Sequence, residues 1–303
     1  MPKLAFIFPG QASQYVGMGR DLYEQFETAR QIYDQAEALV PFDLKSLSFE
    51  GPLEQLTQTR YTQPAVFVHS VAAAKLLKER GIAPDAVAGH SLGTYAALVI
   101  AGVLGFEDAL RAVCARAALM QKGGEDHPGT MAAIIGLPDE AIRTLCETAS
   151  IGEDAVFPAN FNAPGQVVLS GTIPAVERAI ALAKESGAKM AIPLSVSGAF
   201  HSPLMGAVEQ EMERVLSQIV FSPAQIPFVD NVTADVAMAP DQIRDLLVQQ
   251  LTHPVRWVAS MQKLVAMGVD TVVEVGPGKV LQGLMRRIDR SVRTQGADRA
   301  EDI

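Results

Sequence analysis

The chain has 303 residues, 49% of them hydrophobic, which predicts a sizeable core and suggests one large domain with a smaller one. Its formal net charge of −9 argues against nucleic acid as a general partner, and its two cysteines offer neither metal spacing nor a disulfide framework. The longest apolar run is too short to span a bilayer and the N-terminal apolar segment is too short for a signal peptide, so we expect a protein of the cytoplasm or an organellar matrix.

Strands and helices alternate through the first part of the chain. A strand is predicted over residues 3–8, and the glycine loop Pro9–Gln14 after it can carry backbone N–H donors to a site. The further elements expected here are helices at 21–40 and 62–79, a strand at 85–88, and helices at 94–101 and 106–121. This alternation is typical of an α/β fold.

The pattern changes after a polar linker at residues 123–129. The expected elements are a strand at 131–135, a helix at 139–148, strands at 156–161 and 166–170, a helix at 173–186 and a strand at 189–194. This β-α-β-β-α-β order is that of a split βαβ unit. We therefore expect residues 128–197 to form a small ferredoxin-like domain, inserted into a large α/β domain of residues 1–127 and 198–303.

The remainder of the chain returns to the α/β pattern. It is expected to contain a helix at 203–218, a strand at 226–229, helices at 240–251 and 257–267, a strand at 271–275 and a last helix after Gly276-Pro277-Gly278. From Ser291 onwards the sequence is polar, and we expect this tail to be frayed.

The most informative motif is Gly89-His90-Ser91-Leu92-Gly93, which lies between a short apolar strand and an apolar helix. A strand that runs into Gly-x-Ser-x-Gly and then a helix is the arrangement by which α/β enzymes expose a nucleophilic serine. The flanking glycines allow strand and helix to pass closely at the strained serine. The motif predicts acyl transfer through Ser91.

A serine nucleophile needs a base, and the chain offers five histidines: His69, His90, His127, His201 and His253. His69 lies in an apolar helix and is interpreted as a core or helix-face residue, whereas His127 and His253 are typical of ordinary loops. His90 adjoins the serine on a tight turn and is better placed to touch substrate. His201 follows a predicted strand and precedes a helix, where a parallel α/β sheet places its site loops. No aspartate is an obvious third member by position.

Arg116 is the second clue, because its neighbours one helical turn before and after it are apolar. Arg111 on the same helix instead has acidic residues one turn back, which indicates a solvated face. A guanidinium that emerges from an apolar surface needs an anion, which is either a protein carboxylate or a ligand. For an acyl-transfer site, a carboxylate on the acyl group suits the planar fork of an arginine.

Over roughly residues 3–290 the chain resembles the malonyl-CoA:acyl-carrier-protein transacylases, the acyltransferases of fatty acid and polyketide synthesis. The matching stretches are Phe8-Pro9-Gly10-Gln11-Ala12-Ser13-Gln14, Gly89-His90-Ser91-Leu92-Gly93, Arg116 with Met120-Gln121, Asn160-Phe161-Asn162-Ala163-Pro164-Gly165-Gln166, Gly198-Ala199-Phe200-His201-Ser202, and Glu274-Val275-Gly276-Pro277-Gly278. The resemblance implies an α/β-hydrolase-like parallel-sheet core with a ferredoxin-like insert, which agrees with the elements above.

The resemblance also implies roles for individual residues. Ser91 would be the nucleophile and His201 its base, with the backbone carbonyl of Gln250 orienting the imidazole. The N–H groups of Gln11 and Leu92 would form the oxyanion hole. Substrate contacts would come from Arg116 on the malonyl carboxylate and from His90, Asn162 and Phe200. Thr94 departs from the family, which usually has glutamate after the elbow glycine.

The reaction implied is a ping-pong transfer of malonyl from malonyl-CoA to the phosphopantetheine thiol of acyl carrier protein, by a monomer without cofactor or metal. The alternatives are an acyl hydrolase of the same fold that edits stalled chains, a trans-acting polyketide acyltransferase, and a non-catalytic scaffold that docks carrier protein. Arg116 argues against the hydrolase, and the intact serine, histidine and oxyanion loop argue against the scaffold.

A basic cluster on the last helix is a candidate surface for the carrier protein. Acyl carrier proteins are acidic as a class and this chain is itself net negative, so docking needs a local basic surface. The candidates are Lys279, Arg286, Arg287 and Arg290, with Arg293 at the helix exit and Lys184 and Lys189 on the small domain as the second choice.

Overall fold

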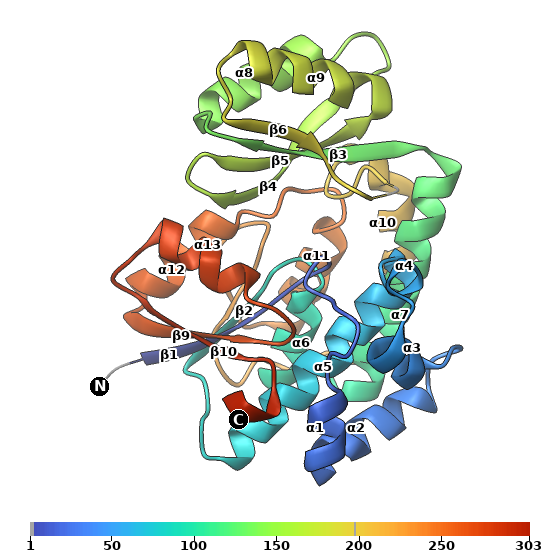
Figure 1. The fold of residues 1–303 in the computed structure, drawn as a ribbon, viewed down its shortest axis with the longest axis vertical. Coiled ribbons are helices and arrows are strands. Elements are labelled where there is room, and N and C mark those ends of the chain that lie inside the picture. Colours follow the sequence, from blue (N-terminus) through green and yellow to red (C-terminus); the bar gives the residue numbers. More distant parts are fainter. Residues whose placement is uncertain (1–2, 197) are drawn as a thin grey trace.

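Two separate sheets organise the molecule (Figure 1). The computed structural model describes residues 3–196 and 198–303. The larger sheet has six strands in the order β10-β9-β1-β2-β7-β8, and the smaller has four in the order β4-β5-β3-β6. The chain is thus a mixed α/β protein with one sheet that is largely parallel and a second that is antiparallel.

The larger sheet positions the loops of the site. Its strands are β1 (Lys3–Phe8), β2 (Ala86–Gly89), β7 (Phe228–Val229), β8 (Val236–Ala237), β9 (Val269–Val275) and β10 (Arg293–Ala297). Only β8 pairs antiparallel, with β7. Phe8 at the end of β1 is in register with Gly89 at the end of β2, so the two loops that follow start side by side. Carboxyl ends of parallel strands are where α/β sheets bind their ligands.

Both faces of the larger sheet are buried, as its apolar central strands predict. Ala5 and Ile7 point to the face that packs with α12 (Trp257–Ala266) and α13 (Val280–Ile288). Phe6 and Phe8 point to the opposite face, which packs in one core with α5, α6 and α7. The helices of the first part of the chain are α1 (Arg20–Gln25), α2 (Glu27–Glu37), α3 (Leu44–Glu50), α4 (Leu53–Leu56), α5 (Thr59–Glu79), α6 (Gly93–Ile100) and α7 (Phe106–Asp126).

Two expectations for these helices were wrong. The single helix expected over residues 21–40 is broken at Phe26, whose extended backbone separates α1 from α2. The linker expected at 123–129 is helical as far as Asp126, because α7 continues through its two glycines. A Cβ on Gly123 would lie 2.5 Å from the Val208 side chain of α10 (Gly206–Leu216), so the missing side chain lets the two helices pack closely.

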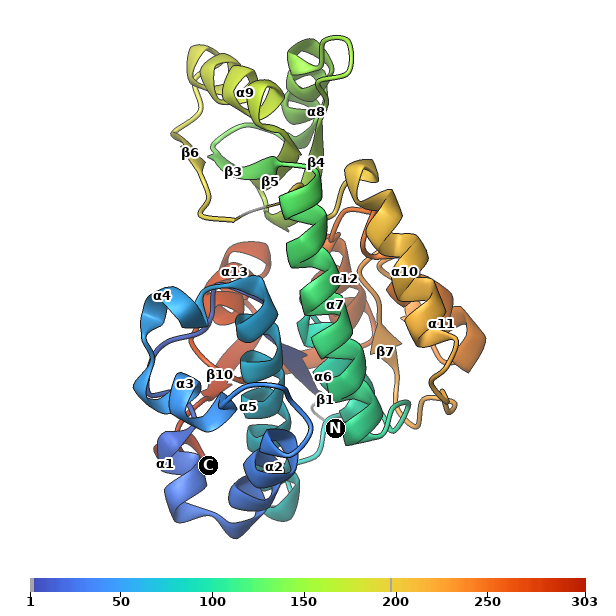
Figure 2. The ribbon, with the colours of Figure 1, turned by 90° about the vertical axis from the view of Figure 1, so that its right-hand side faces the viewer.

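The smaller sheet has the element order expected from the sequence. It consists of β3 (Gly129–Ile135), β4 (Val156–Ala163), β5 (Gln166–Thr172) and β6 (Met190–Pro193), with α8 (Asp139–Ala149) and α9 (Ile173–Glu185) covering one face. The other face is directed towards the larger sheet (Figure 1). Figure 2 shows α7 running from the level of the larger sheet up to β3 of the smaller one.

The C-terminal part contains the clearest error of the sequence analysis. After η1 (Pro203–Met205), α10 and α11 (Pro240–Gln249), the chain completes the larger sheet and ends in η2 (Ala300–Asp302). The tail from Ser291, expected to be frayed, instead forms the edge strand β10, which pairs in parallel with β9. Asp298 after it is only 6% exposed.

Among the helices of residues 3–196 and 198–303, none is both long and apolar enough to cross a membrane.

Candidate active site

Ser91 stands on a sharp turn between β2 and α6. Its φ of 51° lies in the left-handed region, which is rare for a residue with a side chain and indicates a strained position. A Cβ on Gly89 would lie 2.1 Å from the Gly93 carbonyl carbon, and one on Gly93 would lie 2.1 Å from the Phe8 carbonyl oxygen. The two glycines are therefore required by close backbone approach.

His201 is the histidine that reaches the serine. Its Nε2 lies 2.8 Å from Ser91 Oγ, and its Nδ1 lies 2.8 Å from the backbone carbonyl oxygen of Gln250. Because a carbonyl can only accept, Nδ1 carries the hydrogen, which leaves the Nε2 lone pair to accept the serine proton. The sequence-predicted serine, base and orienting carbonyl are thus brought together.

The imidazole of His201 is held in its neutral form. Burial and then the positive charge of Arg116 lower the pKa of His201 to about 3, against an ordinary value of 6.5, and the bond to the Gln250 carbonyl only partly opposes this. At neutral pH the free protein therefore has an unprotonated imidazole beside Ser91, ready to accept a proton.

Arg116 is a buried cation without an anion. It is 1% exposed, and its guanidinium donates to Gln63 Oε1 at 2.8 Å and to Ser91 Oγ at 2.9 Å. Its Nε makes no hydrogen bond, and no Asp or Glu pairs with it in the part of the chain that the structure describes. A buried charge without a partner costs several kcal/mol, so the arrangement favours a bound anion.

A cavity of about 220 Å³ opens over these groups, between the two sheets. Its walls combine Ser91, His201 and Arg116 with apolar side chains of the smaller sheet, α7 and α13, and no Asp or Glu is among the described residues that line it. Gln11 and Leu92 belong to its lining, and the backbone amide of neither donates a hydrogen bond to another described residue. Leu92 also precedes α6, whose N-terminal dipole favours negative charge.

The smaller sheet and the loop after it contribute the far wall. The Oδ1 atom of Asn162, in β4, lies 2.8 Å from His90 Nε2, and this contact links the smaller sheet to the serine turn. His90 also stacks edge-on against Trp257, with ring centroids 5.3 Å apart, and burial lowers its pKa. Phe200 is 5% exposed and borders the cavity beside His201. These are the positions that the sequence analysis expected to touch substrate.

A layer of polar residues beneath the serine was not predicted from the sequence. Asn231 accepts from the Ser91 amide at 2.8 Å and donates to the Gly89 carbonyl at 2.9 Å. The Gln250 side chain donates to Thr94 Oγ1 at 2.9 Å and to Asn231 Oδ1 at 3.1 Å. The available signal for Asn231 was its place just after the predicted strand at 226–229. Thr94 was noticed only as a departure from the family.

The remaining histidines and the basic cluster lie elsewhere. His69 is 0% exposed in α5, as its apolar surroundings predicted, whereas His127 and His253 are exposed. Lys279, Arg286, Arg287 and Arg290 are exposed on and beside α13. Arg287 also donates to Gln166 Oε1 and to the Pro164 carbonyl, so it ties α13 to the β4–β5 turn. In the described ranges no group of three or more His, Cys, Asp or Glu side chains is arranged to hold a metal ion.

Comparison with known proteins gives a consistent result. The family described as acyl transferase domain matches residues 5–301. The chain is 45% identical over 303 residues to the malonyl CoA-acyl carrier protein transacylase of Bacillus subtilis (strain 168), covering 100% of this chain and 96% of that protein. The corresponding transacylase of Escherichia coli (strain K12) is 45% identical over 289 residues, covering 95% of this chain and 93% of that one.

Solved structures agree over the whole fold. An acyl carrier protein S-malonyltransferase from Vibrio cholerae O1 biovar eltor superposes with a TM-score of 0.95 at 44% identity, covering 99% of this chain and 98% of that chain. A malonyl-transacylase in complex with a type II PKS acyl-carrier protein gives a TM-score of 0.96 at 41% identity, covering 99% and 97%. The chain therefore belongs to the acyl transferase domain family.

Proposed function

We propose that this chain transfers a malonyl group from malonyl-CoA to the phosphopantetheine thiol of an acyl carrier protein, through a malonyl-Ser91 intermediate. The observation that carries the proposal is Arg116, a buried guanidinium that lies 2.9 Å from the nucleophile oxygen and has no carboxylate partner among the described residues. An acyl group with its own carboxylate supplies the missing anion and is held bidentately. Relatives at 45% identity are named for this transfer.

In the first half-reaction Ser91 Oγ attacks the thioester carbonyl while its proton passes to His201 Nε2. The new C–O bond forms, the C–S bond breaks, and the departing CoA sulfur takes the proton from His201. The negative charge on the tetrahedral oxygen is received by the amides of Gln11 and Leu92, each worth about 3 kcal/mol by analogy with other oxyanion donors. In the second half-reaction the carrier thiol gives its proton to His201 and its sulfur attacks the ester carbonyl. The new C–S bond forms, the C–O bond to Ser91 breaks, and Ser91 Oγ takes the proton back from His201.

Arg116 also couples binding to the strength of the base. Its positive charge is the second cause of the low pKa of His201. When the malonyl carboxylate pairs with Arg116, this charge is offset and the imidazole becomes a better proton acceptor. An acetyl group, which has no carboxylate, leaves the charge in place. Selectivity for malonyl therefore comes from the anion contact itself and from activation of the base.

The cavity favours transfer over hydrolysis. Its described walls include the apolar side chains of Met120, Met131, Val168, Leu194 and Phe200, which exclude water around the ester. A small, largely apolar chamber suits a short acyl group. The hydrolase and the scaffold are not favoured, since the first has no use for Arg116 and the second has none for the Ser91–His201 pair.

We further propose that carrier protein docks on the basic residues of α13. Lys279 adjoins Val280, which lines the mouth of the cavity, so a carrier bound there lies beside the entrance. Because Arg287 already bonds to the β4–β5 turn, Lys279 and Arg290 are the better positions to reverse. Lys279→Glu with Arg290→Glu should raise the KM for carrier several-fold, more at low salt, while Lys75→Glu on α5 should not.

The fold of each domain, the oligomeric state and the cellular location are also proposals. The strand order β4-β5-β3-β6, all antiparallel, supports a ferredoxin-like small domain of residues 128–197, and the Ser91 elbow supports an α/β-hydrolase-like core formed by 1–127 and 198–303. We also propose that the protein is cytoplasmic. We propose that it acts as a monomer without a cofactor, because every step above uses groups of one chain, the CoA thioester and the carrier thiol.

The test of the function is the mass of the intact protein after mixing with malonyl-CoA, followed by addition of holo acyl carrier protein. We expect a malonyl adduct that is stable until the carrier is added and then moves to the carrier. Release of free malonate without carrier would favour the hydrolase, and the absence of any adduct would favour the scaffold.

A further inference from the structure

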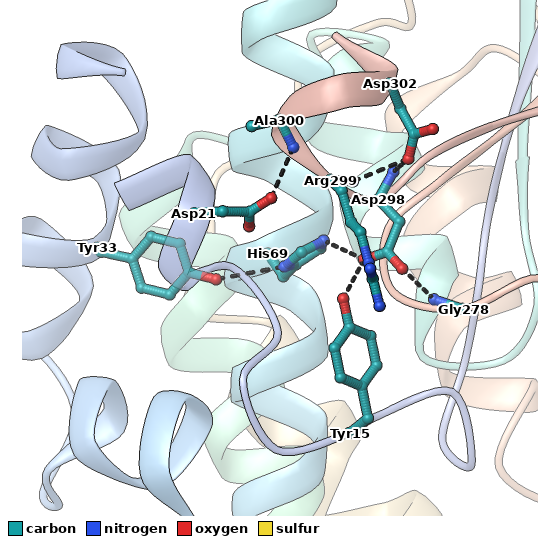
Figure 3. Close-up of polar contacts among 9 residues, drawn as sticks. All are labelled: Tyr15, Asp21, Tyr33, His69, Gly278, Asp298, Arg299, Ala300 and Asp302. Carbon is teal, nitrogen blue, oxygen red and sulfur yellow. Dashed lines mark hydrogen bonds and ion pairs between the residues drawn. The ribbon is translucent and has the colours of Figure 1, made fainter. Parts of the chain in front are cut away.

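A second buried polar cluster lies away from the candidate active site, where the C-terminal tail meets α5 and the loop after β1 (Figure 3). Its centre is Asp298, which directly follows β10. Asp298 Oδ1 accepts a hydrogen bond from the Tyr15 hydroxyl at 2.9 Å and lies 3.2 Å from His69 Nε2. Its other oxygen accepts from the Gly278 amide at 3.1 Å. One carboxylate thus joins three segments that are distant in sequence.

These contacts keep the carboxylate charged in a buried place. Burial by itself would raise the pKa of Asp298, but the contacts with His69, Gly278 and Tyr15 hold it below its ordinary value. On its other side, Tyr15 has the Arg299 guanidinium 5.9 Å from its ring centroid. Removing one partner of a buried charge is costly, so the cluster resists opening.

The tail that carries Asp298 is anchored independently of Tyr15. Asp302 Oδ2 accepts from the amides of Asp298 and Arg299 at 3.1 and 2.9 Å, and Asp21 Oδ2 accepts from the Ala300 amide at 2.7 Å. β10 is paired along its length with β9. Asp298 is therefore a fixed point to which the loop after β1 is tied (Figure 3).

That loop includes residues 9–14, and its Gln11 lines the cavity. No backbone-to-backbone hydrogen bond holds residues 9–14 in the described structure, and Ala12 has a left-handed φ of 79°. Side chains hold the loop instead: Ser13 Oγ donates to the Gly10 carbonyl at 2.7 Å, and Gln11 Nε2 donates to Thr59 Oγ1 at 3.2 Å. A loop held in this way depends on its few side-chain anchors.

Asp298 acts on this loop from two directions. Through Tyr15 it holds the chain four residues after Gln11. Through the Gly278 amide it holds the turn after β9 against the loop, where a Cβ on Gly278 would lie 3.3 Å from the Ser13 carbonyl oxygen. Catalytic donors are effective only when they are fixed before the charge develops, and a displacement of about 1 Å can cost about 100-fold.

We propose that Asp298 is a positioning residue that preorganises the Gln11 amide for the oxyanion, acting through Tyr15 and Gly278. This inference rests on the role proposed above for Gln11. In this role the C-terminal tail contributes to catalysis although none of its residues lines the cavity.

The test compares variants that cut the tie to the loop with a variant that only loosens the tail. Tyr15→Phe removes one hydroxyl and keeps the ring, Asp298→Ala removes both acceptor oxygens, and Asp298→Asn keeps one. Asp21→Asn is the matched control, because it weakens one anchor of the tail and does not touch the loop, while Asp302 and the β10–β9 pairing still fix Asp298. For each variant the rate of Ser91 malonylation, the KM for malonyl-CoA and hydrogen exchange at residues 10–18 are measured.

We expect Asp298→Ala to lower the malonylation rate at saturation by about 10-fold or more with little change in KM, because a transition-state donor is loosened and ground-state contacts are not. Tyr15→Phe and Asp298→Asn should give smaller losses, and exchange at residues 10–18 should be faster in all three. Asp21→Asn should leave the rate unchanged.

An unchanged rate in folded Tyr15→Phe and Asp298→Asn proteins would overturn the inference, as would an equal loss in Asp21→Asn, which would show a general effect of stability. If the wild-type protein forms no malonyl adduct, the proposed function fails instead. Exchange at residues 10–18 then still decides whether Asp298 holds the loop.

Discussion

The molecule contains two buried histidine clusters, and only one of them includes a carboxylate. In the cluster around His69, the carboxylate of Asp298 lies 3.2 Å from the imidazole. Around His201, the nearby charge is the cation Arg116, and no acid of the described chain pairs with it. The first cluster has a charge partner within the protein, whereas the second leaves a place for an anion. A buried polar cluster that lacks a counter-charge is thus a good indication of where a charged ligand binds.

The largest effect that separates the two clusters should come from their serines. Ser91→Ala removes the nucleophile, so we expect malonyl adduct formation to fall on the order of 1000-fold or more. Ser70→Ala removes the buried serine next to His69 and should leave the adduct unchanged. Intact-protein mass checks both. Malonylation that persists in Ser91→Ala would contradict the assignment.

Arg116→Ala tests whether the unpaired cation selects the acyl group. Loss of one partner of a desolvated charge pair costs about 2–5 kcal/mol, so malonyl transfer should fall steeply while acetyl transfer loses no contact. Arg111→Ala on the same helix is the control, because Arg111 is exposed and lies 3.6 Å from Glu107. Competition between malonyl-CoA and acetyl-CoA measures the preference, and an unchanged ratio would make Arg116 a structural residue.

The pKa of His201 gives a prediction with a definite sign. Because burial and Arg116 lower this pKa to about 3 from 6.5, the free enzyme should keep a neutral base well below pH 6.5. The folded state resists protonation, so the stability that the neutral imidazole contributes is complete above pH 6.5 and is lost as the pH falls towards 3.

Labelling of Ser91 by an uncharged sulfonyl fluoride measures this titration without the malonyl carboxylate. In the wild-type protein the labelling rate should fall only at a pH far below 6.5. In Arg116→Gln it should fall at a higher pH, because this variant removes one of the two main causes of the low His201 pKa. A labelling rate that falls near pH 6.5 in both proteins would show that His201 is not held neutral.

The smallest effect is expected in the polar layer beneath the serine. Thr94→Val removes the oxygen that accepts from Gln250 Nε2, and a buried donor that loses an acceptor costs about 1–3 kcal/mol. We expect a lower melting temperature and a several-fold lower rate. Thr94→Ser keeps the hydroxyl and should behave as wild type. Equal behaviour of the Val and Ser variants would show that the hydroxyl is dispensable.

The sequence predicted those parts of the site whose signals are local. The Ser91 elbow needs two glycines within five residues, and the exceptional environment of Arg116 is visible within one turn on either side. The order of strands and helices along residues 129–193 followed from the same short-range patterns. These features could be predicted because the residues that determine them are neighbours in the chain.

The parts that were missed depend on residues far apart in sequence. Asn231 reaches the Ser91 amide across 140 positions, and its place after the predicted strand at 226–229 does not indicate which residue it contacts. β10 is polar, so its sequence resembles a frayed tail, and it is ordered by pairing with β9 and by the burial of Asp298. Gly123 by itself is typical of a linker, but in the fold its missing side chain allows α7 and α10 to pack closely.

The role of Arg116 as the binding site of the malonyl carboxylate is tested most directly by a crystal structure of the wild-type protein malonylated by malonyl-CoA in the absence of carrier protein. We expect an ester on Ser91 Oγ, its carbonyl oxygen within hydrogen-bond distance of the Gln11 and Leu92 amides, and the malonyl carboxylate paired with the Arg116 guanidinium. A malonyl carboxylate directed into solvent, with Arg116 still bonded only to its present partners, would contradict the claim that the ligand supplies the missing anion.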